Sequence, residues 1–293
     1  MANFVTMLIS GLGIGSIYAL VAMGFVVIYK CTKILNLAQG ELVLIGSYIC
    51  FSLASFLNLP VGLALVLGAL LAAGFGAIVQ RLFIQPLIGQ PVFSTVVMTL
   101  GLGMLLRSIA FAIWGAAPLG TLGMFPASLG EIGGVMIRGS DVGALAVSLG
   151  LIAAFLLFFR HSRIGIRMRA VADDEQAAEA LKMKVRQLFL VAWALAGATA
   201  AVAGTLFGAR SIFDVSLVSV GFKCLAVVFL GGLESFSGVL AAGMLIGIVE
   251  AMAGLYLAPF LPGCKDVIAY ALIVVILIFR PYGFRGQEEI ERV

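Results

Sequence analysis

Side chains that build metal and redox centres are rare in this sequence. The 293 residues include one histidine, His161, and four cysteines. The cysteines lack the close spacing to one another or to histidine that zinc and redox sites require, so free thiols and no metal site are expected. They are Cys31, Cys50, Cys224 and Cys264. No nucleophile stands beside a base, and no G-x-x-x-x-G-K-[ST] motif occurs, so the chain alone is expected neither to act as an enzyme nor to hydrolyse ATP.

Charge is scarce as well. Charged residues make up 11% of the chain, hydrophobic residues make up 62%, and the mean hydropathy is +1.19. A soluble domain has roughly 25% charged residues, so this composition predicts a protein of the lipid bilayer. No hydrophilic stretch is long enough for a second fold, so residues 1–293 are expected to form one domain. The net charge of +4 does not indicate nucleic-acid binding, because the basic residues lie at the ends of apolar segments.

Long apolar segments recur along the chain and predict an all-α, polytopic transmembrane bundle of about 8–9 spans. The segments are 4–29, 34–57, 61–83, 92–114, 142–159, 187–209, 215–232, 238–257 and 266–280. The last is short for the roughly 20 residues that a crossing needs. The segment 215–232 contains Lys223 and ends in two glycines, which leaves a broken or re-entrant helix open.

Basic residues are concentrated in alternate loops. One set of loops carries Lys30, Lys33, Arg81, seven basic residues between positions 160 and 186, Arg280, Arg285 and Arg292. The other set carries only Arg138, Arg210 and Lys265. Because cytoplasmic loops carry the excess of lysine and arginine, the first set is expected in the cytoplasm. With nine crossings, the N-terminus is then periplasmic and the C-terminus cytoplasmic.

The segment from Arg160 to Arg186 concentrates charge in an otherwise apolar chain. Asp173 is followed three residues later by Gln176, as in a capping box, which predicts a helix that Asp173 caps. Acids then occupy its first turn and lysines its end, as the helix dipole favours. The stripe formed by Ala170, Val171, Ala177, Ala178 and Leu181 predicts an amphipathic helix whose exposed apolar face docks on a cytoplasmic partner.

Glycines spaced four residues apart occur in several apolar segments. The pairs are Gly11/Gly15, Gly204/Gly208 and Gly243/Gly247. Such pairs allow helices to approach closely in lipid. A phosphate-binding loop is not expected at the first pair, because that loop follows a strand and this pair lies within one apolar segment.

Polar residues interrupt two of the apolar segments. They are Asn36, Gln39 and Glu41 in the sequence N-L-A-Q-G-E, and Ser94, Thr95 and Thr99 in the fourth segment. Amides and carboxylates are costly in lipid, so they should face protein or a water-filled cavity. Two roles remain open for these residues, namely hydrogen bonding between helices or lining of a translocation path.

Ionisable residues also lie within the apolar segments. They are Arg107, Lys223, Glu234 and Glu250. Buried charges must pair or face water, so we expect an ion pair between two of them as a structural latch, with pore lining as the alternative. No series of acids or histidines accompanies them that would indicate a proton relay.

Five motifs spread over nearly the whole chain are shared with a known family. They read G-I-G-S-I-Y-A-L-V-A-M-G (Gly13 to Gly24), I-L-N-L-A-Q-G-E (Ile34 to Glu41), R-A-V-A-D-D-E-Q-A-A-E-A-L (Arg169 to Leu181), F-K-C-L-A-V-V-F-L-G-G-L-E-S (Phe222 to Ser235) and K-D-V-I-A-Y-A-L (Lys265 to Leu272). Through them the chain resembles the permease subunits of high-affinity ABC importers for branched-chain amino acids. Similar permeases carry urea, amides or aromatic acids, so the resemblance does not identify the solute.

The resemblance implies a subunit of the bacterial inner membrane that works with ATPase subunits, a periplasmic solute-binding protein and a second permease, for which it favours a paralogue. It implies no cofactor, since ATP is bound by the partner subunits. It also implies that the loop 160–186 contains a coupling helix that fits a cleft on the ATPase. The matching residues are Arg169, Val171, Asp173, Asp174, Ala178, Glu179 and Leu181. The family continues with Gly-Ile where this chain has Lys182 and Met183, so the end of that helix is expected to differ.

Two other classes of membrane protein compete with this interpretation. A stand-alone secondary transporter or channel would need its own coupling-ion site at broken helices, for which segment 215–232 is the only hint. A membrane-embedded enzyme would need catalytic residues that the sequence lacks.

Overall fold

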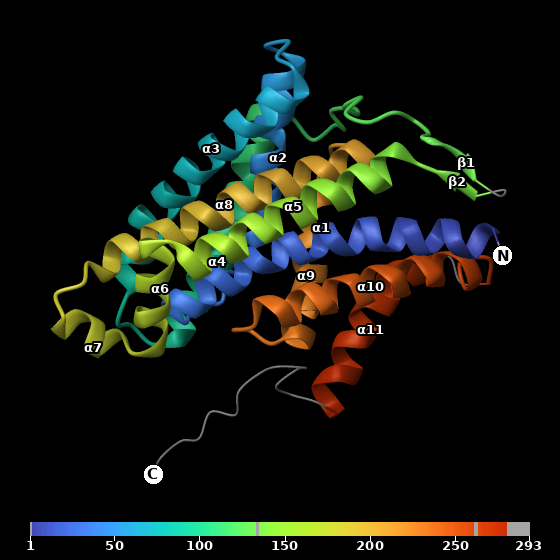
Figure 1. Cartoon of the computed structure of the whole chain (residues 1–293). Coiled ribbons are helices and arrows are strands. Elements are labelled where there is room, and N and C mark those ends of the chain that lie inside the picture. The colour runs from blue at the N-terminus through green and yellow to red at the C-terminus, as the bar shows by residue number, and fades with distance from the viewer. Residues whose placement is uncertain (1, 133–134, 261–262, 280–293) are drawn as a thin grey trace.

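The computed structural model describes residues 2–132, 135–260 and 263–279, which form a bundle of helices (Figure 1). The helices are α1 (Ala2–Thr32), α2 (Gln39–Ser55), α3 (Val61–Val79), α4 (Val92–Trp114), α5 (Gly139–His161), α6 (Arg163–Asp173), α7 (Glu175–Ala180), α8 (Val185–Arg210), α9 (Leu217–Gly231), α10 (Phe236–Tyr256) and α11 (Cys264–Phe279). A π-helical turn, η1 (Gln80–Ile84), and a 3₁₀ turn, η2 (Gln85–Leu87), extend α3. The predicted all-α membrane bundle is confirmed.

Every predicted apolar segment contains a helix, and proline and glycine set several of the boundaries. Pro60 and Pro91 stand immediately before α3 and α4, where the missing N–H leaves no hydrogen bond unmade. Gly115 and Gly232 end α4 and α9 with φ values of 81° and 97°. Glycine adopts these values without the steric cost that a side chain brings.

Six helices of the described chain are long and apolar enough to cross a membrane. The apolar helices α2, α9 and α11 have 17, 15 and 16 residues, fewer than the roughly 20 of a full span, so the exact number of crossings stays a prediction. Helix α9 is continuous from Leu217 to Gly231, which shows that segment 215–232 is not broken. The predicted cytoplasmic residues Arg280, Arg285 and Arg292 lie outside the described residues.

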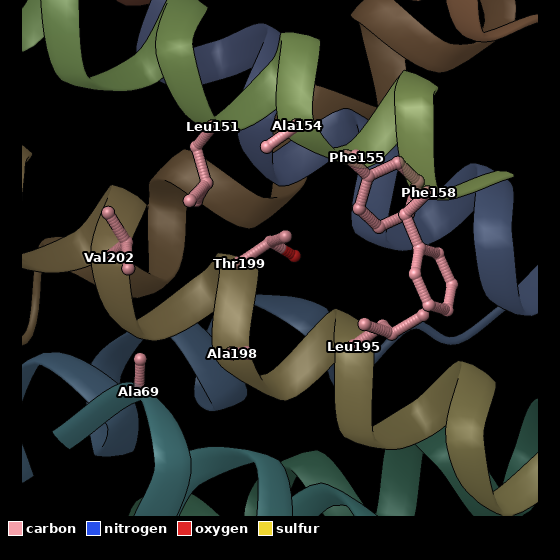
Figure 2. Close-up of a pocket in the computed structure, with 9 residues that line it drawn as sticks. All are labelled: Ala69, Leu151, Ala154, Phe155, Phe158, Leu195, Ala198, Thr199 and Val202. Carbon is pink, nitrogen blue, oxygen red and sulfur yellow. The ribbon is translucent and has the colours of Figure 1, made fainter. Parts of the chain in front are cut away.

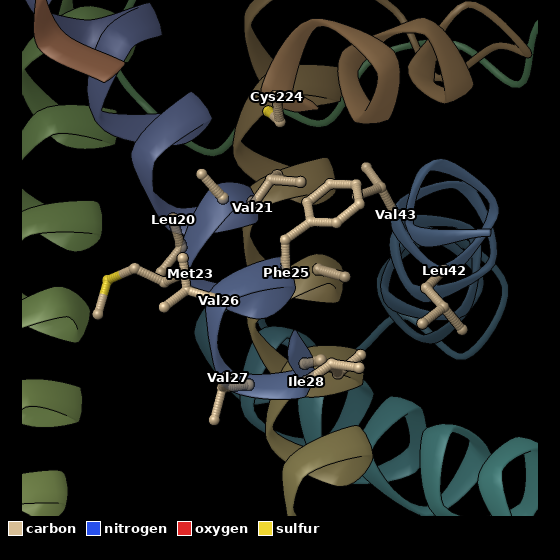
Figure 3. Close-up of a cluster of buried hydrophobic side chains, with 14 of the residues drawn as sticks. Leu20, Val21, Met23, Phe25, Val26, Val27, Ile28, Leu42, Val43 and Cys224 are labelled. Atoms are coloured by element: carbon tan, nitrogen blue, oxygen red, sulfur yellow. The ribbon is translucent and has the colours of Figure 1, made fainter. Parts of the chain in front are cut away.

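Helix α1 runs through the middle of the bundle, and α2, α5, α8, α9 and α10 pack against it (Figure 1). In its apolar window 89% of the residues are buried, compared with 22% for α3 and 28% for α4. Figure 3 shows the Phe25 ring beside Val43 of α2, with Cys224 of α9 nearby. The hydrophobic core is therefore built around α1.

Two of the predicted glycine pairs meet each other across the contact between α1 and α10. A Cβ at Gly15 would lie 2.6 Å from the Gly243 carbonyl oxygen. A Cβ at Gly247 would lie 2.4 Å from the Gly11 carbonyl oxygen. Since real Cβ atoms do not approach that closely, these glycines let the two backbones touch, and the predicted packing role is confirmed.

The two ends of the bundle carry different segments. One end holds the C-terminal end of α1, the turn between α9 and α10, and helices α6 and α7 (Figure 1). There the Lys33 ammonium pairs with the Glu234 carboxylate. The other end holds the start of α1, Arg210 and a short antiparallel hairpin of β1 (Gly130–Ile132) and β2 (Val135–Ile137). The basic segments after α1 and α5 thus share one end, as the charge distribution predicts.

Candidate functional site

The N-L-A-Q-G-E element covers the turn before α2 and the first residues of that helix, and its two amides are fully buried. Asn36 Oδ1 accepts a hydrogen bond from the Ala38 N–H at 3.1 Å, and Asn36 Nδ2 donates to Gln39 Oε1 at 3.1 Å. Gln39 Nε2 donates to the Ala196 carbonyl of α8 at 3.5 Å. The amides therefore connect the start of α2 to α8. Hydrogen bonding between helices was one of the two roles that the sequence left open. The other role, lining of the translocation path, stays a prediction.

Glycine makes room for this polar element. A Cβ at Gly24 of α1 would lie 2.5 Å from Gln39 Nε2. A Cβ at Gly221 of α9 would lie 2.3 Å from the Gly40 Cα. Helix α9 thus approaches the backbone of α2 at Gly40, and α1 leaves room for the Gln39 side chain, which a side chain at Gly24 would displace.

Glu41 forms an ion pair with Arg107 that joins α2 to α4. Arg107 Nη2 donates to Glu41 Oε1 at 2.7 Å. The two side chains differ in exposure, at 40% for Arg107 and 4% for Glu41. Glu41 Oε2 and Arg107 Nε are buried and have no hydrogen-bond partner within the described chain. The pair is therefore incomplete, with bonding capacity left on both sides.

Lys223 and Glu250 form the ion pair expected from the sequence. Lys223 Nζ donates to Glu250 Oε1 at 2.7 Å, and the Tyr18 hydroxyl donates to Glu250 Oε2 at 2.7 Å. The contact joins α1, α9 and α10, and both charged side chains are less than a tenth exposed. The predicted ion pair is therefore present, while its role as a structural latch stays a prediction.

A further buried ion pair was missed by the sequence analysis. The Asp141 carboxylate at the start of α5 pairs with the Arg210 guanidinium at the end of α8, and Arg210 Nη2 donates to Ser10 Oγ at 3.0 Å. The sequence assigned Arg210 to an external loop because it ends an apolar segment. The signal that could have identified the pair is an acid and a base at the matching ends of neighbouring spans.

The hydroxyl residues predicted in α4 lie mostly within the helix packing. Thr95 and Thr99 are 5% and 0% exposed, and Ser94 is half-buried. The Thr99 hydroxyl donates to the Val96 carbonyl of its own helix at 2.9 Å. Like the amides of Asn36 and Gln39, the two threonines face protein in this structure. Their contact with a solute stays a prediction.

The charged segment 160–186 forms two helices instead of one. Helix α6 continues through Asp173. Asp174 then adopts an extended conformation and caps α7, where its Oδ1 accepts a hydrogen bond from the Ala177 N–H at 2.9 Å. The prediction that Asp173 caps the helix and pairs with Gln176 is wrong by one residue. Both Asp173 and Asp174 are suitable capping residues, and the backbone leaves the helical conformation at Asp174.

The predicted exposed apolar face of this segment is wrong in part, since Ala177 and Leu181 are exposed but two other members of the stripe are not. Val171 and Ala178 are each 3% exposed and pack into the chain's own hydrophobic core. Leu181 is 72% exposed. Arg169 and Glu179 are exposed as well. The surface that a partner can reach is therefore largely charged, with Ile164, Ile166 and Leu181 as its exposed large apolar side chains. The coupling role of these residues stays a prediction.

The exposed surface of α7 is acidic. Partial burial raises the pKa of Glu175 above its ordinary value, and the nearby Glu179 carboxylate raises it further. Like charges on adjacent turns of a helix repel each other. A cationic partner at this surface would relieve that repulsion.

Helix α7 ends in a residue with a left-handed backbone. Lys182 has φ 59°, and its N–H donates to the Glu179 carbonyl at 2.8 Å, while the Met183 N–H donates to the Ala178 carbonyl at 3.0 Å. This pair of bonds is the Schellman motif, in which glycine usually holds the left-handed position. The sequence analysis expected the end of this helix to differ because Lys182 and Met183 replace Gly-Ile. The end nevertheless has the usual Schellman geometry, with lysine in the position that glycine usually holds.

An apolar groove lies between α5 and α8 and is bordered by α3 (Figure 2). Its volume is about 270 Å³, and Phe155, Phe158, Leu195 and Val202 form much of its wall. The Thr199 hydroxyl in the groove already donates to a carbonyl of its own helix at 3.1 Å. The groove suits an acyl chain or an apolar side chain better than a hydrophilic solute.

Comparison with known proteins identifies the family. The family described as branched-chain amino acid transport system / permease component matches residues 7–277. The chain is 29% identical to the high-affinity branched-chain amino acid transport system permease protein BraD of Pseudomonas aeruginosa, over 99% of this chain and 98% of that protein. It is 28% identical to the permease protein LivH of Escherichia coli K12, over 99% and 98% of the two chains. It is also 28% identical to a probable LivH permease of Methanocaldococcus jannaschii, over 93% and 90%.

These matches span nearly the whole chain and agree with the membrane bundle described above. The chain therefore belongs to the family of branched-chain amino acid transport permeases and is the permease subunit of an ABC importer.

Proposed function

We propose that this permease subunit forms part of the path for branched-chain amino acids, or for a related small amino acid, amide or organic acid. The observation that carries the proposal is the near full-length similarity to permeases named for branched-chain amino acid transport. The sequence lacks a nucleotide-binding motif, so we infer that partner ATPase subunits bind and hydrolyse ATP.

Helices α6 and α7 are the surface that we propose for the ATPase. They project at the end of the bundle where α1 ends (Figure 1). Their basic and acidic side chains are exposed, so a partner in water can reach them. ATP-driven movement of this docked segment would change which end of the path is open. A periplasmic binding protein would deliver the solute at the opposite end, and a second, paralogous permease would complete the path.

The proposed orientation can be tested with impermeant thiol reagents. Single cysteines placed at Arg163 and Lys184 should label from the cytoplasmic side and a cysteine at Arg138 from the periplasmic side, since all three positions are exposed. The four native cysteines are buried, which keeps the background low. Labelling of position 163 or 184 from the periplasm would contradict the orientation.

The proposed activity can be tested by reconstitution. The chain should be assembled in liposomes with the proposed second permease, ATPases and binding protein, and uptake of radiolabelled leucine should be measured with and without ATP. We expect uptake only with ATP and only in the complete assembly. Leucine uptake by the purified chain alone would instead support the stand-alone transporter.

A further inference from the structure

Helix α4 is packed on one side only. Its principal neighbour is α2, and its buried positions form a single face toward that helix. The remaining surface carries large exposed apolar side chains, namely Phe93, Val97, Leu100, Met104 and Ile113. Lipid or another subunit must therefore cover most of α4.

Arg107 lies at the border between these two faces and differs from the other cations within the bundle. Its side chain is 40% exposed, whereas those of Lys223 and Arg210 are 7% and 11% exposed. Each of the latter two is sealed against a buried carboxylate. The guanidinium of Arg107 touches Glu41 on one side and is open on the other.

The depth of Arg107 follows from the contacts between α2 and α4. Trp114 Nε1 donates to Ser52 Oγ at 2.7 Å, so the C-terminal ends of the two helices lie level. Arg107 lies about 10 Å before Trp114, and Glu41 lies about 16 Å before Ser52, at 1.5 Å per helical residue. Because it contacts Glu41, the Arg107 side chain reaches from its own level away from the C-terminal end of α4 and toward the middle of that helix.

An exposed guanidinium at that depth is unfavourable against acyl chains, so it faces water or protein. It also has hydrogen-bonding capacity left on its exposed part, because Nε is buried and only Nη2 contacts Glu41. Arginine binds carboxylates through parallel hydrogen bonds, a geometry that lysine cannot match.

We propose that Arg107 lines the translocation path at the edge of α4 and binds the carboxylate of the passing solute, while Glu41 holds the guanidinium in position. This inference rests on the proposed transport of amino acids. Recognition of the carboxylate, which every amino acid carries, leaves the side chain of the solute free to vary. The partly neutralised cation would bind the carboxylate weakly enough to release it.

The test is equilibrium binding of radiolabelled leucine to the assembled complex without the binding protein, whose own specificity would hide that of the path. Unlabelled leucine should displace the label, and leucinamide, which lacks the carboxylate, should not. We expect R107Q to weaken leucine binding about tenfold or more and R107K to retain part of it, because a charged hydrogen bond is lost or weakened. M104L, a change of similar volume on the exposed apolar face of α4, should bind like the wild type.

Accessibility provides a second measurement that does not depend on the folding of R107Q. A cysteine at Ser108 should react with an impermeant thiol reagent, and leucine should slow the reaction while leucinamide should not. Wild-type binding by R107Q would overturn the inference, and so would loss of contact between the two permeases in both Arg107 variants, which would assign the arginine to the subunit interface. If the wild-type complex transports no leucine, the proposed function itself fails.

Discussion

The Lys223 ammonium lies 2.7 Å from Glu250 Oε1, and this contact ties α9 to α10 in the interior of the bundle. The Tyr18 hydroxyl reaches the other carboxylate oxygen from α1. Three helices that are distant in the sequence are thus fixed at one carboxylate. Removing one charge of such a pair leaves the other buried without compensation.

The first prediction concerns this ion pair. We expect Lys223→Met to lower the free energy of unfolding by about 3–5 kcal/mol, because the Glu250 carboxylate is left unpaired in a buried site. The matched control is Lys33→Met, which removes the exposed pair with Glu234 and should cost at most about 1 kcal/mol. Denaturant unfolding in detergent measures both. The double variant that also carries Glu250→Met should regain most of the loss, and equal costs for the two lysine variants would disprove the latch.

The second prediction concerns the close contact of α1 with α10. A Cβ at Gly247 would lie 2.4 Å from backbone atoms of Gly11 and Gly15. We expect Gly247→Ala to cost about 1–3 kcal/mol through overpacking. Gly150→Ala in α5 is the control, since a Cβ there meets no atom within 4 Å. The yield of folded protein and its unfolding midpoint should fall for position 247 alone, and an equal response at both positions would contradict the packing role.

The third prediction concerns the left-handed lysine at the end of α7. Lys182→Gly should stabilise this helix end by about 1 kcal/mol, because glycine adopts positive φ without the clash that Cβ causes. Slower hydrogen exchange of the α7 amides would report the gain. Lys184→Gly, at a residue with φ −82°, should bring no gain and instead loosen the start of α8. Faster exchange in the Lys182 variant would show that the side chain itself holds the turn.

The fourth prediction concerns the docking surface. Leu181→Asp and Glu179→Lys change exposed groups of α7 and should leave the folded permease intact. We expect each to reduce ATP-dependent uptake about tenfold, as truncation of an interface anchor does. Ala178→Asp should instead reduce the amount of folded protein, because this alanine packs into the chain's own core. Unchanged uptake in both exposed variants would remove α7 from the proposed interface.

Much of the fold could be predicted from the sequence because helix formation in lipid is a local property. A chain segment without water must satisfy its own backbone hydrogen bonds, so apolar length alone locates the helices. The glycine spacing likewise identified helix contacts, since Gly15 and Gly243 do meet. The sequence did not show which helices these glycine pairs would bring together.

The partners of the charges could not be predicted, because pairing depends on contacts between distant segments. Arg107 was expected among four intramembrane charges, yet its partner is Glu41, which the sequence grouped with the amides of its motif. The burial of Ala178 was missed for a similar reason. A small apolar residue beside acids on a short helix fits an exposed face and a buried one equally well, and only the packing of α7 against α8 decides.

The central position of α1 has a consequence for how the protein is made. Tyr18 and its partner Glu250 are separated by 232 residues, so α1 enters the membrane long before α10 is synthesised. At roughly 5–20 residues per second, translation of that interval takes tens of seconds. During this time the face of α1 that carries Gly11 and Gly15 is not yet covered by α10. A chain whose synthesis stops before α10 would expose this face permanently, which would make it a substrate for proteolytic quality control in the membrane.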